Sequence, residues 1–128
     1  MRFLLIDDNP GILDCLSKLL SLKGHVSAIF TNPEQAVKAF ARDEFDVVIT
    51  DLNLPGMSGL ELTEAVKAHN PDTHVLVTTG CSDLSETDCY NSDEIHAFLH
   101  KPIDLEHLFA IILNIEKELR IISTRSVK

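Results

Sequence analysis

Acidic side chains follow two apolar runs in the first half of the chain. Asp7 and Asp8 come directly after residues 3–6, and Asp51 comes directly after residues 47–50. The second run begins with three β-branched apolar residues, which is typical of a strand buried on both faces of a parallel sheet. Asp51 is therefore expected at the carboxyl end of a central strand, where open α/β sheets place their ligand sites. An aspartate at such a position can also do no more than cap a turn.

Two later apolar runs also end in polar groups, at Thr79 and Lys101. The carboxyl ends of parallel strands meet at one edge of a sheet, so these groups are expected to share a cleft with the acidic ones. Three carboxylates so close together would repel one another unless a cation neutralised them. Mg²⁺ suits such a site, because it takes one or two protein carboxylates together with water and phosphate oxygens. The expected ligands are Asp8, Asp51 and the backbone carbonyl of Asn53, with Asp7 acting through water.

This set of side chains predicts phosphoryl chemistry. With a metal ion and Lys101 drawing charge away from a phosphoryl group, Asp51 could attack phosphorus as a carboxylate nucleophile and form an acyl phosphate. The ammonium of Lys101 and the hydroxyl of Thr79 would then hold the phosphoryl oxygens. Each residue alone is weak support, and the combination of all five at separate intervals carries the prediction.

The elements that must position these groups alternate along the chain. Strands are predicted at residues 3–6, 26–30, 46–50, 75–78 and 95–99. Helices are predicted after the capping residues Asn9, Asn32, Ser58 and Asp104, the last of them keeping its apolar period to Leu119. A further short helix, more mobile than the others, is expected at about residues 83–92, where Ser, Asp and Asn compete for backbone hydrogen bonds. Five strands alternating with five helices predict an α/β fold with a doubly wound parallel sheet.

Composition limits the class of protein. A chain of 128 residues with 45% hydrophobic residues fits one globular domain. The formal net charge of −9 argues against a nucleic-acid surface, because the binding of phosphates needs clustered Lys and Arg. No apolar run is long enough to span a membrane, and the first residues do not resemble a secretory signal. Cys15, Cys81 and Cys89 form no paired pattern, so reduced thiols and a cytoplasmic location are expected.

The same residues resemble the receiver domain of two-component response regulators. The resemblance covers about residues 2–119 and rests on these motifs: Asp7-Asp8, Asp51-Leu52-Asn53-Leu54-Pro55 with Gly59 following, Thr79-Gly80, and Phe98-Leu99-His100-Lys101-Pro102. It implies a flavodoxin-like sheet of strand order 2-1-3-4-5. It further implies a signalling domain rather than an enzyme, which takes a phosphoryl group from the histidine of a sensor kinase or a phosphotransfer protein.

The resemblance also implies a role for each site residue. Asp51 would be the phosphoacceptor, Asp7 and Asp8 would bind Mg²⁺, and Lys101 would bind phosphate and precede Pro102 through a cis bond. Thr79 and Phe98 would form the switch pair. By the resemblance, phosphorylation changes the face made by the fourth helix, the fifth strand and the fifth helix, and so changes which downstream effector binds.

Some features depart from the family pattern or leave alternatives open. Gly80 stands where alanine is more common, and Cys81 after it either tunes the access of water to the acyl phosphate or has a redox role. Signalling through the polar fourth helix could rest on order and disorder instead of a rigid shift. In the last helix, Ile111 and Leu113 lie outside the main apolar stripe, which fits either a homodimer or deeper burial. The receiver domain is assigned to residues 1–119, and residues 120–128 are a tail or the start of a linker.

Two other functions would use parts of the same pattern. A phosphatase similar to the haloacid dehalogenase family would need an acid/base Asp two residues after the nucleophile, where Asn53 stands and cannot shuttle the proton. A constitutive binding module of the same fold would not take phosphate. The intact set of five polar residues speaks against that module.

Overall fold

The computed structural model describes residues 1–80 and 94–126. Its five strands are β1 (Arg2–Ile6), β2 (Val26–Phe30), β3 (Val47–Asp51), β4 (His74–Thr79) and β5 (Ala97–His100). They form one parallel sheet in the order β2-β1-β3-β4-β5, which confirms the predicted topology. The strand boundaries differ from the sequence prediction by no more than two residues, and β2 matches it.

The helices in the described part of the chain are α1 (Pro10–Leu22), α2 (Pro33–Arg42), α3 (Gly59–His69) and α4 (Leu105–Ser126). Five helices were predicted, and the additional one, at about residues 83–92, lies outside the described residues. All four predicted capping side chains accept backbone N–H groups of the first turn: Asn9, Asn32, Ser58 and Asp104. Gly24, with φ of +86°, ends α1 in the left-handed conformation that favours glycine.

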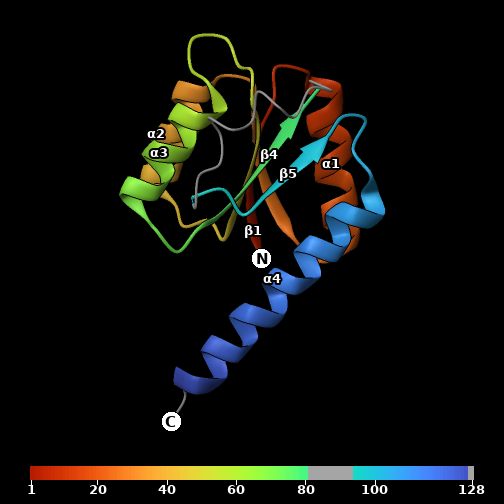
Figure 1. Ribbon diagram of the computed structural model, residues 1–128, viewed down its shortest axis with the longest axis vertical. Coiled ribbons are helices and arrows are strands. Elements are labelled where there is room, and N and C mark those ends of the chain that lie inside the picture. Colours follow the sequence, from red (N-terminus) through yellow and green to blue (C-terminus); the bar gives the residue numbers. More distant parts are fainter. Residues whose placement is uncertain (81–93, 127–128) are drawn as a thin grey trace.

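The sheet lies between two helical layers, α1 and α4 on one face and α2 and α3 on the other (Figure 1). Alternation along β1 shows how the strands serve both layers, since Phe3 and Leu5 belong to the cluster under α1 and α4, whereas Leu4 and Ile6 belong to the cluster under α2 and α3. All four side chains are almost completely buried. This burial on both faces explains why the central strands are continuous apolar runs.

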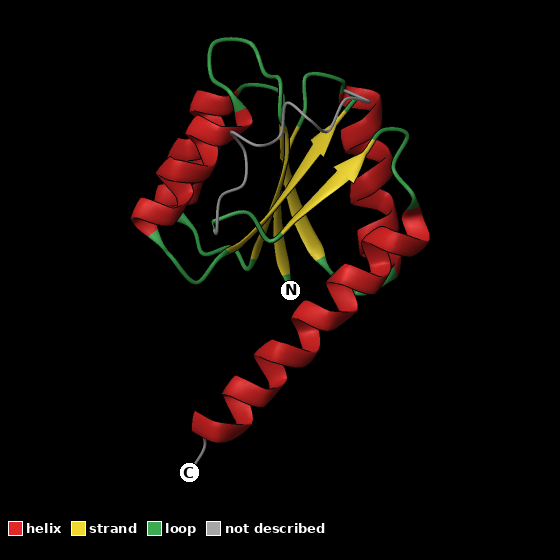
Figure 2. Cartoon of the chain, viewed as in Figure 1, coloured by secondary structure: helices red, strands yellow, loops and turns green. Residues whose placement is uncertain are grey.

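The helix α4 continues to Ser126, beyond the apolar period that ends at Leu119. Its C-terminal part runs past the sheet and away from the body of the domain (Figures 1 and 2). Ile111 is 9% exposed and belongs to the core, which fits the deeper-burial alternative, whereas Leu113 is 49% exposed. No helix within the described ranges is long and apolar enough to cross a membrane.

Candidate functional site

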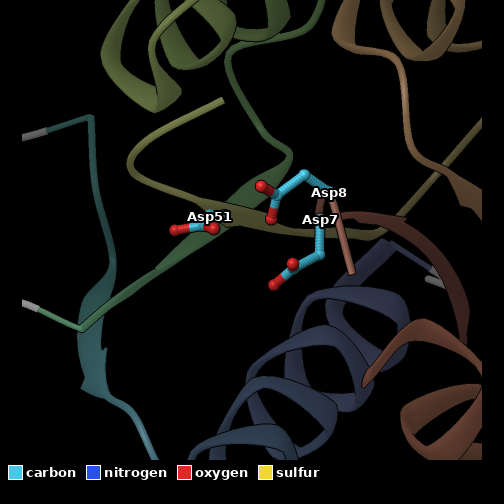
Figure 3. A group of neighbouring side chains, drawn as sticks. All are labelled: Asp7, Asp8 and Asp51. Carbon is cyan, nitrogen blue, oxygen red and sulfur yellow. The ribbon is translucent and has the colours of Figure 1, made fainter. Parts of the chain in front are cut away.

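Three carboxylates meet at the carboxyl edge of the sheet. Asp7 follows β1 directly and Asp51 is the last residue of β3, and these two strands are hydrogen-bonded neighbours. Asp7 and Asp51 are buried, whereas Asp8 is exposed. One carboxylate oxygen from each of the three lies within 4.8 Å of the others, and Figure 3 shows the three side chains around one space. The predicted acidic cluster is therefore present in the structure.

Lys101 also lies at this edge of the sheet, where it follows an outermost strand, β5. Its Nζ donates to Asp7 Oδ2 at 2.9 Å and to Asp51 Oδ2 at 3.0 Å. Its backbone N–H donates to the carbonyl of Thr79 at 2.8 Å, and the Lys101–Pro102 bond is cis. Burial alone would lower the pKa of the Lys101 ammonium, but its hydrogen bonds to Asp7 and Asp51 and the charges of both carboxylates outweigh burial and raise the pKa. Lys101 is therefore cationic throughout the neutral range.

Backbone N–H groups orient both buried carboxylates. The N–H of Asn9 donates to Asp7 Oδ1 at 2.9 Å, and the N–H of Asn53 donates to Asp51 Oδ1 at 3.3 Å. Each carboxylate thus has one oxygen on a backbone donor and the other on Lys101. Because both side chains are held at two points, their oxygens occupy defined positions and need little reorganisation before reaction.

Thr79 and Phe98 lie on adjacent strands. Thr79 is the last residue of β4 and is 1% exposed, and Phe98 in β5 pairs in register with Val77, two residues before Thr79. Phe98 is half-buried and packs against the hydrophobic cluster under α2 and α3. A displacement of Thr79 could therefore be transmitted to the ring of Phe98 through the pairing of two neighbouring strands. Whether the two act as a switch stays a prediction.

The donor set fits Mg²⁺. All of its side-chain donors are carboxylate oxygens, which a hard divalent ion prefers, and the exposure of Asp8 leaves room for water ligands. Asn53 lies in the loop after β3, two residues beyond Asp51 at the same edge of the sheet, and is exposed. Its carbonyl as a fourth ligand remains a prediction from the sequence.

Sequence reasoning missed two features of the site. It assigned Lys101 to phosphoryl oxygens but did not predict its direct contacts with Asp7 and Asp51. It also gave no structural role to Gly59, whose amide N–H donates to the carbonyl of Leu52 at 2.7 Å. The spacing between Asp51 and Gly59 was the signal available, but only as part of the family motif.

Comparison with known proteins agrees with this geometry. A family model described as response regulator receiver domain matches residues 3–113. The chain is 29% identical to the DNA-binding transcriptional regulator NtrC of Escherichia coli K12 over 84% of the chain and 23% of that protein. It is 30% identical to the response regulator MprA of Mycobacterium leprae over 88% of the chain and 49% of that protein. The chain thus spans less than half the length of these curated relatives.

Solved structures of similar chains have the same fold. The signal receiver domain of an HD domain-containing protein from Pseudomonas fluorescens Pf-5 superposes with a TM-score of 0.82 at 30% identity, covering 91% of this chain and 94% of that one. A response regulator receiver domain protein from Clostridium thermocellum gives a TM-score of 0.85 at 26% identity, covering 94% of this chain and 98% of that one. Both cover more than nine-tenths of this chain.

Proposed function

Because this chain belongs to the response regulator receiver domain family of two-component signalling, we propose that it accepts a phosphoryl group on Asp51 in a Mg²⁺-dependent reaction. The donor would be a phosphorylated histidine of a sensor kinase or phosphotransfer protein. The observation that carries the proposal is the position of Lys101 Nζ between Asp7 and Asp51, with Asp8 beside them. That arrangement gives Asp51 both a fixed carboxylate and a nearby cation.

The transfer requires little more than positioning and charge stabilisation from the protein. An oxygen of the Asp51 carboxylate forms a bond to phosphorus while the bond between phosphorus and the donor's histidine nitrogen breaks. The electron pair of that bond remains on the nitrogen. Lys101, already hydrogen-bonded to Asp51 Oδ2, would hold a phosphoryl oxygen by a small displacement of its ammonium.

The metal site would use the carboxylates of Asp7, Asp8 and Asp51 with the carbonyl of Asn53. A bound Mg²⁺ neutralises the acidic cluster and withdraws charge from phosphoryl oxygens. Asp51 takes part in both functions, since one carboxylate oxygen can bind the ion while the other attacks phosphorus. The two oxygens of Asp51 are not equivalent, because only Oδ1 accepts a hydrogen bond from the backbone N–H of Asn53.

The output of the reaction would pass through Thr79 and Phe98. The hydroxyl of Thr79 would bind a phosphoryl oxygen, and the ring of Phe98 would follow into the space that this movement opens. A downstream effector protein or domain would then bind the changed face next to β5. We assign the receiver to residues 1–119 and residues 120–128 to a tail or linker, although α4 itself continues to Ser126. The free thiol of Cys15 fits a reducing, cytoplasmic location.

The proposal is tested with acetyl phosphate and Mg²⁺, followed by intact mass spectrometry. The parent protein should gain the mass of one phosphoryl group, and Asp51→Asn should gain none under the same conditions. A chelator of divalent ions should abolish the gain. A parent protein that gains no phosphoryl group would instead support the constitutive binding module, and rapid multiple turnover of a small phosphomonoester would support a phosphatase.

A further inference from the structure

The first residue of α3, Gly59, is packed against the backbone that carries Asp51. A Cβ atom added to Gly59 would lie 2.6 Å from the Asp51 carbonyl oxygen and 2.9 Å from the Leu52 Cα. Both distances are shorter than real Cβ contacts, and both involve backbone atoms rather than the flexible end of a side chain. Gly59 has no positive φ, so its lack of a side chain is what this position requires. Alanine would otherwise be the better residue in a helix.

Hydrogen bonds hold both sides of this contact. On the α3 side, the hydroxyl of Thr63 donates to the Gly59 carbonyl at 2.7 Å, and Thr63 is 2% exposed. On the β3 side, the backbone N–H of Leu52 donates to the carbonyl of Thr78 at 2.8 Å. The Gly59 N–H then joins the two sides through the Leu52 carbonyl at 2.7 Å. Neither side can move without breaking bonds that fix the end of β3.

We infer that Gly59 is a positioning residue for Asp51: its missing side chain lets the first turn of α3 press against β3, and this contact sets where the Asp51 carboxylate lies relative to Lys101 and Asp7. The inference rests on the proposed phosphoacceptor role of Asp51. Gly59 does not touch the reacting atoms, and it acts only through the backbone of residues 51 and 52. It therefore contributes to the reaction through geometry and not through charge.

The expected effect follows from the size of the displacement. Bringing a methyl group from 2.6 Å to an ordinary contact of about 3.4 Å moves the Asp51 backbone or α3 by roughly 0.8 Å, and misplacement of a reacting group by about 1 Å can cost roughly 10²-fold in rate. The contacts of Asp51 Oδ2 with Lys101 at 3.0 Å and of Asp51 Oδ1 with the Asn53 N–H at 3.3 Å would both change. A loss of phosphorylation rate and a loss of Mg²⁺ affinity should therefore occur together.

The test compares Gly59→Ala with two controls by the rate constant for phosphorylation by acetyl phosphate and by Mg²⁺ affinity from calorimetry. Gly24→Ala makes the same chemical change between α1 and β2, at the amino edge of the sheet, where an added Cβ meets no described atom within 4 Å and only the φ of +86° makes alanine unfavourable. Ile115→Ala removes a fully buried side chain of α4 on the opposite face of the sheet, so it lowers stability without touching Asp51. We expect Gly59→Ala to react at least about 10-fold more slowly and to bind Mg²⁺ more weakly, and both controls to stay within about twofold of the parent.

The outcomes separate this inference from the proposed function. A parent protein that takes no phosphoryl group refutes the proposed function itself. If the parent reacts and Gly59→Ala reacts equally fast, the positioning role is overturned. It is also overturned if Ile115→Ala is slowed as much as Gly59→Ala, because the slower reaction would then result from lower stability. If Gly59→Ala does not fold, Thr63→Val becomes the deciding variant. It removes the hydroxyl hydrogen bond to the Gly59 carbonyl without adding a larger side chain. A Thr63→Val rate equal to the parent's would overturn the inference, and a rate several-fold lower would support it.

Discussion

Lys101 Nζ lies 3.0 Å from Asp51 Oδ2, although the two residues are 50 positions apart in the sequence. Parallel strands separated by β4 bring them to the same edge of the sheet, and the cis bond to Pro102 follows Lys101 directly. The Asp51 side chain is 10% exposed and that of Lys101 is 23% exposed, so the pair is only partly screened by water. The cation needed for a phosphoryl group on Asp51 is thus in contact with that side chain already.

Removal of this cation should destabilise the protein when no divalent ion is present. In Lys101→Met, the carboxylates of Asp7 and Asp51 lose their shared counter-charge, and we expect the free energy of unfolding to fall by roughly 1–3 kcal/mol. Added Mg²⁺ should restore more stability to this variant than it adds to the parent, because it would replace the missing positive charge. Urea denaturation with and without Mg²⁺ measures both effects.

The matched control is Lys18→Met, which breaks the exposed ion pair of Lys18 with Asp14 on α1. Exposed pairs contribute little, so this variant should unfold close to the parent and respond to Mg²⁺ as the parent does. Equal destabilisation of the two lysine variants would contradict the role given to Lys101 in balancing the acidic cluster.

Asp8 is the carboxylate that the structure leaves free to bind a metal ion with little rearrangement, since it is exposed whereas Asp7 and Asp51 both contact Lys101. We expect Asp8→Asn to weaken Mg²⁺ binding by at least about 10-fold. At a Mg²⁺ concentration 100 times the parent's dissociation constant, bound Mg²⁺ should stabilise the parent by about 2.7 kcal/mol and the variant by less. Calorimetric titration measures the affinity. Asp14→Asn, an exposed carboxylate on α1, serves as the control, and equal Mg²⁺ affinity in both variants would contradict the assigned site.

Stability should fall on acidification because of His25, which is buried at the opposite edge of the sheet. Burial lowers the pKa of His25 below 6.5, the amino group of Met1 lowers it further, and Glu116 at 2.9 Å offsets part of the shift. Partial desolvation and the neighbouring His74 also lower the pKa of His96, but this side chain is exposed, so it contributes less to the pH dependence. The unfolded chain therefore binds more protons than the folded protein does in this pH range. The free energy of unfolding has its highest value above about pH 6.5 and decreases as the pH falls below that value.

His25→Gln tests this pH dependence, because glutamine can still donate to Glu116 but does not titrate. Its free energy of unfolding, measured by urea denaturation at several pH values, should fall less steeply below about pH 6.5 than that of the parent. His107→Gln, at an exposed position of α4, should leave the slope as it is in the parent. A slope in His25→Gln as steep as the parent's would assign the acid sensitivity to other groups.

The two sides of α4 should differ in their contribution to stability. Ile112 is 2% exposed and Leu113 is 49% exposed. Ile112→Ala should lower the free energy of unfolding by roughly 2–5 kcal/mol, and Leu113→Ala should change it by no more than about 0.5 kcal/mol. The homodimer predicted from the sequence would use Leu113 rather than Ile111, so sedimentation of Leu113→Ala at high concentration tests it separately. A parent that sediments as a monomer at every concentration would refute the dimer.

The fold was predictable because its signals are local. The β-branched residues 47–50 before Asp51 and the capping residues Asn9, Asn32 and Ser58 indicate their elements from local sequence alone. The extension of α4 beyond Leu119 was not predicted, because that segment lacks a clear apolar period. Boundaries of β5 also shifted, since Ile95 is buried but precedes the residues that pair with β4.

The site was predictable at the level of residue types, because parallel strands deliver their carboxyl ends to one edge. The contacts were not. That Lys101 bridges Asp7 and Asp51 depends on its side-chain conformation, and that Gly59 touches Asp51 depends on how closely α3 approaches β3. The contact of His25 Nε2 with Glu116 Oε1 at 2.9 Å likewise joins residues that are far apart in the sequence. Distances of this kind follow from tertiary packing and leave no periodic trace in the sequence.

The most direct test locates the phosphoryl group after phosphorylation by acetyl phosphate in the presence of Mg²⁺. Borohydride reduces an aspartyl phosphate to homoserine and leaves the phosphates of serine and threonine unchanged, so peptide mapping identifies the modified residue. We expect homoserine at position 51, formed only when both the phosphoryl donor and Mg²⁺ are present. Homoserine at another aspartate, or none at all in a protein whose fold is intact, would contradict it.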